Sequence, residues 1–176
     1  MHKIVNDILV KGGWFEGRKV PIDDVINYWK KEKYLLYPDQ INFIQEFHNL
    51  GLRFHNINGH QYHIEIDPLS NDVPLWALKK YIKYANANLV CFGEVVCQNT
   101  FLFITQDSKI YGAYEDEIVF WGNNFYESLE NVYFDNISWE IMKDFFVDID
   151  DDENIFLEDL LGDSIKNLSD DNKIEK

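Results

Sequence analysis

Three histidines surround a predicted hairpin, and imidazole nitrogens can bind zinc or transfer protons near neutral pH. They are His55, His60 and His63, with Asn58-Gly59 as the turn between them. A metal site needs ligands that converge on one point, but His60 and His63 are three apart on one predicted strand and point to opposite faces. We therefore interpret them as exposed strand histidines, and we expect no bound metal.

Glu94 and Cys97 are the next candidates for catalysis, and Glu94 follows Gly93 within a predicted strand. A nucleophilic cysteine would need a neighbouring base, and a strongly acidic chain favours a raised rather than a lowered thiol pKa. We predict instead that Glu94 makes a structural ion pair with Arg18. A small hydrolase that uses Glu94 with a nearby histidine is kept as an alternative function.

The sequence lacks the motifs of common enzyme classes. It contains no glycine-rich phosphate loop, no Cys-x-x-Cys pair and no Gly-x-Ser-x-Gly elbow. Its two cysteines, Cys91 and Cys97, would lie about 20 Å apart on a shared strand, which is too far for a disulfide. We therefore predict a protein that is not an enzyme, needs no cofactor and keeps two reduced, half-buried thiols.

Net charge limits the range of partners. The 176 residues include 31 acidic and 16 basic side chains, which gives a formal charge of −15. A field of this sign repels nucleic-acid phosphates and favours a basic protein partner. The chain has no apolar run near the roughly 20 residues of a membrane span, and its N-terminus resembles no signal peptide. We predict a cytoplasmic protein that binds another protein, without direct contact to nucleic acid or membrane.

Exposed acids are the candidate partner-binding residues. Glu115, Asp116 and Glu117 share a predicted turn, and Trp121 ends the next strand, where an exposed indole would anchor a partner. The C-terminal segment adds Asp150, Asp151, Asp152 and Glu153. Residues 148–176 hold 11 acidic and 3 basic side chains. We therefore predict a domain over 1–147 and an acidic, solvated extension over 148–176.

Hydrophobic spacing predicts the elements that position these residues. Helices are expected after Pro21, from Pro38 to a stop at Gly51, from Pro74 to Ala85, over 123–132 and from Ser138 to about Phe146. Strands are expected at 53–55, 60–66, 89–96, 100–105, 109–114 and 117–121. The strand at 100–105 is apolar on both sides, so we expect it to be central and covered on both faces. The pattern indicates a single α+β domain with a largely antiparallel central sheet flanked by helices.

Several short motifs occur in a familiar order. Gly13-Trp14-Phe15-Glu16-Gly17-Arg18 precedes the Pro21 helix, Asp67-Pro68 follows a strand, and Gly93-Glu94 lies in the next strand block. The hairpin at 101–111 and Gly122-Asn123-Asn124-Phe125 come after them. This ordered set resembles the SUKH superfamily (the Smi/Knr-type fold), in its third subfamily, over about residues 12 to 135.

The resemblance implies a bacterial immunity protein that binds and neutralises a cognate polymorphic toxin, often through a basic, nuclease-type toxin domain. It also implies structural roles for the motif residues, which are Gly13, Trp14, Gly17, Arg18, Asp67, Pro68, Gly93 and Glu94. A cytosolic regulatory or scaffolding module of the same fold, with a non-toxin partner, is the alternative interpretation.

Overall fold

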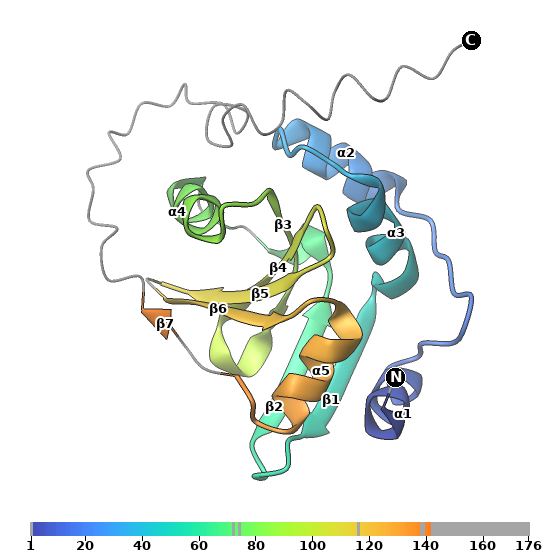
Figure 1. The fold of residues 1–176 in the computed structure, drawn as a ribbon. Coiled ribbons are helices and arrows are strands. Elements are labelled where there is room, and N and C mark those ends of the chain that lie inside the picture. Colours follow the sequence, from blue (N-terminus) through green and yellow to red (C-terminus); the bar gives the residue numbers. More distant parts are fainter. Residues whose placement is uncertain (1, 72, 74, 116, 138–139, 142–176) are drawn as a thin grey trace.

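The computed structural model describes residues 2–71, 73, 75–115, 117–137 and 140–141 (Figure 1). Within these ranges the helices are α1 (Lys3–Lys11), α2 (Asp23–Lys31), α3 (Pro38–Phe47), α4 (Leu75–Ala85) and α5 (Phe125–Tyr133). The strands are β1 (Leu50–His55), β2 (Gln61–Ile66), β3 (Leu89–Val95), β4 (Thr100–Thr105), β5 (Ile110–Tyr114), β6 (Glu117–Gly122) and β7 (Glu140–Ile141). No helix among the described residues is long and apolar enough to cross a membrane.

The strands form one sheet in chain order, β1 to β7, and every neighbouring pair is antiparallel. Such a meander needs only short connections between most strands. The exceptions are the β2–β3 and β6–β7 connections, which carry α4 and α5. This arrangement confirms the predicted α+β fold with an antiparallel central sheet.

The two faces of the sheet bury two separate hydrophobic cores. The larger core receives side chains from α1, α2, α3 and α5, while α4 covers the smaller core on the opposite face (Figure 1). Strand β4 supplies Leu102 and Ile104 to the larger core and Phe103 to the smaller one. The expectation of a central strand covered on both faces is confirmed, because alternate side chains of a strand point to opposite sides.

Gly93 allows β2 and β3 to approach each other. A Cβ atom at this position would overlap the carbonyl oxygen of Glu65 on β2. The register of β3 against β4 also shifts between Cys91 and Gly93, which marks a bulge. Any side chain at Gly93 would therefore force backbone atoms apart, so this motif glycine has a purely steric role.

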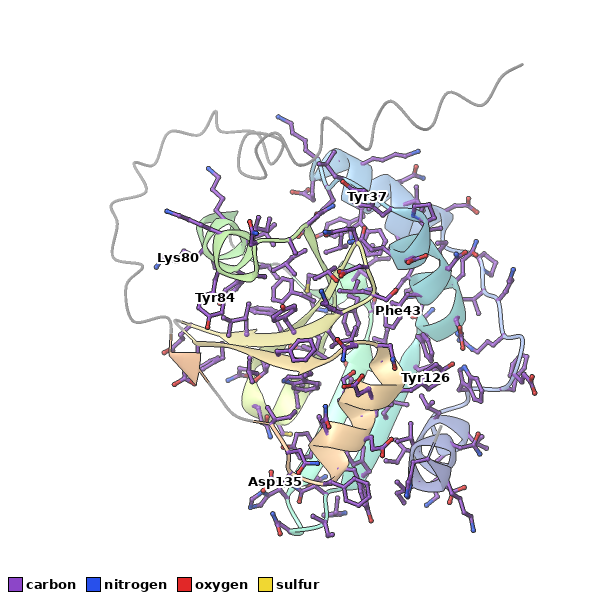
Figure 2. The ribbon with its side chains drawn as sticks, in the orientation of Figure 1. Tyr37, Phe43, Lys80, Tyr84, Tyr126 and Asp135 are labelled. Carbon is purple, nitrogen blue, oxygen red and sulfur yellow. The ribbon has the colours of Figure 1, made fainter. Side chains whose placement is uncertain are left out.

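The hairpin predicted at Asn58-Gly59 is confirmed, and its tip is tied to the end of α5. Gly59 adopts a φ of +82°, which glycine tolerates without strain. The carboxylate of Asp135 accepts hydrogen bonds from the side-chain amides of Asn58 (2.6 Å) and Asn56 (3.4 Å). Figure 2 shows Asp135 beside this turn. The contact fixes the long β1–β2 hairpin against the helical layer.

Three expectations about secondary structure need correction. Helix α1 was not predicted, although Val5, Ile8 and Leu9 on it are fully packed in the larger core. Helix α3 ends at Phe47 rather than at Gly51, because Asn49 takes a φ of +63° and the chain then enters β1. Residues Glu140–Ile141 pair with β6 as a strand, so the helix predicted from Ser138 is wrong there, and its remainder lies outside the described residues.

The two cysteines also differ from the expectation of half-buried thiols. Both are free, but Cys91 is buried beneath α4 and Cys97 is exposed. Burial is the largest cause that raises the pKa of the Cys91 thiol, to about 12. Cys91 is therefore held as an inert thiol within the core.

Candidate functional site

The Gly13–Arg18 motif forms a tight loop directly after α1. The backbone N–H of Trp14 donates to the carbonyl of Leu9 at 3.0 Å, and that of Arg18 donates to the carbonyl of Phe15 at 3.1 Å. Gly13 and Gly17 take φ values of +96° and +78°. These left-handed conformations explain why the motif places glycine at both positions. The loop thereby turns Trp14 and Arg18 toward α3.

Trp14 and Tyr126, which lies on α5, donate hydrogen bonds to the same carboxylate oxygen of Glu46. The indole Nε1–H of Trp14 donates to Oε1 of Glu46 at 2.9 Å, and the Tyr126 hydroxyl donates to the same oxygen at 2.8 Å. The two rings lie edge to face, with centroids 6.4 Å apart. Burial, followed by the hydrogen bond to Glu46 and then the charge of Glu46, raises the pKa of Tyr126. Tyr126 therefore keeps its proton and remains a donor to Glu46 across the physiological range.

Arg18 binds the C-terminal end of α3. Its guanidinium donates from Nη1 to the carbonyl of Glu46 and from Nη2 to the carbonyl of His48 at 2.8 Å. A cation at this end of a helix satisfies carbonyls that lack an intrahelical partner. Burial lowers the pKa of Arg18, and the nearby charge of Glu46 opposes that shift. The predicted ion pair with Glu94 is wrong, because the guanidinium is directed to α3 instead.

A groove opens between this loop, α1, α3 and α5. It has a volume of about 920 Å³, and we call it the Trp14 groove. Its lining residues are Asn6, Val10, Trp14, Phe15, Glu16, Gly17, Arg18, Lys19, Asn42, Gln45, Glu46 and Tyr126. Two large apolar side chains on its rim are unusually open to solvent, since Val10 is 52% and Phe15 is 61% exposed. Exposed apolar groups beside fixed polar groups are typical of a protein-binding surface.

A second, smaller hollow of about 260 Å³ shares Asn42, Glu46 and Tyr126 with the Trp14 groove. It continues along α3 toward Asp39 and Ser108. Figure 2 shows Tyr126 on α5 close to Phe43 on α3, which belongs to the aromatic packing beneath this hollow. The two hollows therefore adjoin at residues of α3 and α5.

The predicted acidic turn is placed away from this groove, between β5 and β6. Glu115 is exposed with a φ of +50°, and Glu117 is half-buried. The neighbouring Tyr114 is 38% exposed. A hydrogen bond with Glu115 is the main cause that raises the pKa of Tyr114. Asp116 and the tail acids Asp150, Asp151, Asp152 and Glu153 lie outside the described residues.

Trp121 does not provide the exposed anchor that the sequence suggested. Its side chain is 1% exposed and packs in the larger core, where Gly112 lies against the indole ring. A strand end looks accessible from sequence, but α5 packs against β6 and covers this face. Trp121 is therefore a core residue, and no partner can reach its ring in this fold.

The remaining motif pairs hold local structure. Asp67 caps the short turn at Pro68–Ser70, because its carboxylate accepts from the backbone N–H of Leu69 at 3.0 Å and from the Ser70 hydroxyl. Pro68 is buried in that turn. Glu94 sits opposite Glu65 in the β2–β3 pair and opposite Phe101 in the β3–β4 pair. These residues contribute no surface to the Trp14 groove.

The histidines predicted around the hairpin do not form a cluster. His55 and His60 are exposed, but His60 precedes β2 and His63 is half-buried, so the expectation of exposed strand histidines holds only for His55. The Nε2 atom of His63 lies 3.1 Å from a Glu65 carboxylate oxygen. Within the part of the chain that the structure describes, no group of three His, Cys, Asp or Glu side chains is arranged to hold a metal ion. The hairpin therefore offers no site for metal chemistry among the described residues.

The sequence was compared with models of known protein families. The sequence profile of the SUKH-3 immunity protein family matches residues 1–133. The chain belongs to the SUKH-3 immunity protein family. Comparison with curated proteins and with solved structures gives no match. The family match extends from before α1 to the last residue of α5, so it includes the whole Trp14 groove of this SUKH-3 protein.

The sequence motif identifies only some of the residues that line the groove. The motif drew attention to Trp14 and Arg18, whereas Glu46, Tyr126 and Val10 had no such signal. Glu46 follows a polar residue on an amphipathic helix, which resembles any solvated helix face. Only the packing of α1 and α5 beside α3 in the SUKH-3 fold makes that face part of a groove.

Proposed function

We propose that this protein neutralises a cognate toxin by binding its toxic domain directly. The observation that carries the proposal is membership of an immunity protein family over the segment that builds the Trp14 groove. An immunity protein of this kind acts by stoichiometric binding, so it needs no catalytic group and no cofactor. The site supports that role, because the groove combines exposed apolar side chains with polar groups held by hydrogen bonds.

The charge of the chain supports a basic toxic domain, of the kind found in nucleases. A net charge of −15 attracts a basic partner and repels nucleic acid. Acidic residues outside the groove, such as Glu115 and Glu117, would speed the encounter rather than hold the complex. We assign the same steering role to Asp116 and to the acidic segment after Val147. The proposed site of action is the cytoplasm, where a toxin that attacks nucleic acid would reach its target.

The test uses the full chain and the candidate toxic domain encoded beside its gene. The toxic domain alone should arrest growth of a bacterial host, and co-expression of this protein should restore growth. The purified pair should elute together as a stable complex. A family member from another toxin pair serves as the control and should neither rescue growth nor co-elute. Absence of a complex between the full chain and that domain would contradict the proposed function.

A further inference from the structure

We propose that the Trp14 groove binds an arginine side chain of the toxic domain, with Glu46 as its carboxylate partner. This inference rests on the proposed function and specifies the chemistry of its binding site. Glu46 lines both the groove and the adjoining hollow on α3. An arginine that enters the groove would therefore meet this carboxylate, which both hollows share.

The carboxylate of Glu46 is held in place through one of its two oxygens. Oε1 accepts hydrogen bonds from Trp14 and Tyr126, which fixes the orientation of the side chain. Among the described residues, none donates a hydrogen bond to Oε2. A carboxylate has capacity for about four hydrogen bonds, so Glu46 retains acceptor capacity for an incoming cation. A site fixed in advance loses little entropy when the partner binds.

The aromatic rings around Glu46 favour a guanidinium over an ammonium group. Trp14 and Tyr126 flank the carboxylate, and Phe15 extends from the same loop into solvent. Guanidinium groups are planar, are weakly hydrated and stack on aromatic faces, while their paired N–H groups match a carboxylate. Lysine offers a compact, strongly hydrated charge and gains less from this combination of groups.

The charges that line the groove leave room for an incoming cation. Glu16 on the rim and Asp39 in the adjoining hollow add negative charge. Arg18 interacts with the Glu46 charge, but its guanidinium donates to two main-chain carbonyls at the end of α3, and the residue is 9% exposed. Lys19 is the remaining basic side chain of the lining, and it is exposed to solvent. The strongly negative chain as a whole adds long-range attraction for a basic segment.

Apolar rim residues give the partner a second type of contact. Val10 and Phe15 lie on the rim of the groove, each more than half exposed. An arginine buries its aliphatic stem along apolar surface while its charged end binds a carboxylate. The occupant we propose is therefore an arginine with an apolar neighbour in the toxin, rather than an isolated surface charge.

A small-molecule titration tests the site without any toxin. The probe is L-argininamide, and the matched control is L-citrullinamide, which keeps the α-amino group but carries an uncharged ureido group in place of the guanidinium. The NMR resonance of the Trp14 indole N–H reports directly on Glu46, since that proton is donated to Oε1. It is assigned by its loss in Trp14→Phe. We expect a saturable shift with L-argininamide in the full chain, and neither a shift with L-citrullinamide nor a shift in Glu46→Gln. Equal shifts with both probes, or none with L-argininamide, would overturn the proposal.

The complex tests the same residue in its functional setting. Glu46→Gln keeps an oxygen that accepts from Trp14 and Tyr126 but removes the negative charge. The expected result is a loss of affinity for the toxic domain of about tenfold or more, mainly through faster dissociation. Glu32→Gln removes the same charge from an exposed carboxylate outside the groove and should leave the affinity near wild type. Equal melting temperatures of the two variants would exclude a difference in folding.

A double-mutant cycle then identifies the partner residue. Each arginine of the toxic domain is changed to glutamine and is measured against wild type and Glu46→Gln. One arginine should couple to Glu46, so that the two changes together weaken binding less than the product of their separate effects. If the wild-type pair binds but no arginine couples to Glu46, the inference fails alone. If the wild-type pair does not bind at all, the proposed function fails with it.

Discussion

The Trp14 groove and the β5–β6 turn each place an aromatic ring beside a carboxylate, but the two carboxylates are held by contacts of different range. In the groove, Glu46 binds Trp14 across 32 positions of the chain and Tyr126 across 80. At the turn, the Glu115 carboxylate interacts with Tyr114, its immediate neighbour, while the Glu115 main-chain carbonyl accepts a hydrogen bond from the Tyr81 hydroxyl of α4 at 2.9 Å. Long-range contacts from two other elements hold the Glu46 carboxylate, whereas the Glu115 carboxylate contacts its neighbour and stays exposed to solvent. The comparison separates a surface suited to holding a partner from one suited to attracting it.

This difference corresponds to the two rates that determine affinity. Fixed polar groups with apolar neighbours slow dissociation, because they are already arranged to match the partner. Exposed charges act mainly on association, and salt screens their effect. Mutations in the groove should therefore change stability and dissociation, whereas mutations at the turn should change association alone.

The largest effect is expected for Trp14→Ala. The change removes a half-buried indole and a hydrogen bond to a carboxylate, so the free energy of unfolding should fall by about 2–3 kcal/mol. Denaturant unfolding measures the change. Phe15→Ala is the matched control, because Phe15 is next in sequence but its ring lies mostly in solvent. An unchanged unfolding midpoint in Trp14→Ala would show that the groove is not held by its long-range contacts.

A smaller loss of stability is expected for Arg18→Lys, which keeps the charge but removes the planar pair of donors. Two carbonyls at the end of α3 then share a single ammonium group. We expect the free energy of unfolding to fall by about 1–2 kcal/mol. Lys19→Arg is the control, because Lys19 is the exposed neighbour of Arg18. Equal stabilities of the two variants would contradict the capping role of the Arg18 guanidinium.

The same distinction of range explains what the sequence could predict. Local signals located most of the meander, because the Asn58-Gly59 turn and the continuous apolar run of β4 act between neighbouring residues. Helix α1 was missed although it buries Val5, Ile8 and Leu9, since nine residues without a proline or an acidic first turn give a weak helix signal. The reverse error occurred at Gly51, where a glycine suggested a helix stop but belongs to β1.

Prediction of the site failed for the same physical reason. The sequence marked Trp14 and Arg18 through their motif but paired Arg18 with Glu94, because no local rule brings the loop to the end of α3. Trp121 ends a strand, and its burial depends on α5, which packs on β6. Glu46 becomes distinctive only when Trp14 and Tyr126 approach it from two other elements. Such information is contained in the tertiary packing and not in residue spacing.

Tyr126→Phe should change both stability and its dependence on pH. Loss of one hydrogen bond to Glu46 should lower the free energy of unfolding by about 1 kcal/mol at neutral pH. The pKa of Tyr126 is raised above its ordinary value of 10.0, chiefly by burial. Between the unfolded and folded pKa values, only the folded state holds the proton. Its contribution to stability is therefore complete below about pH 10 and is lost as the pH rises further.

Denaturant unfolding between neutral pH and pH 11 measures this dependence. The stability of wild type should fall more steeply above about pH 10 than that of Tyr126→Phe, since phenylalanine has no proton to lose. Tyr114→Phe is the matched control at the exposed turn. The main cause that raises the pKa of Tyr114 is its hydrogen bond with the neighbouring Glu115. Curves of equal slope for wild type and Tyr126→Phe would contradict a buried contact with Glu46.

The smallest effect is expected for Glu115→Gln at the β5–β6 turn. Glu115 is exposed, and the contact that it makes with Tyr114 is local, so the melting temperature should not change. Removal of one negative charge should slow association with a basic toxic domain by about twofold or less. The difference should vanish at high salt, because screening acts within about 10 Å at 0.1 M ionic strength. Stopped-flow association at low and high salt, with dissociation followed separately, measures the effect. A faster dissociation in Glu115→Gln would place the turn inside the interface and remove the distinction between the two regions.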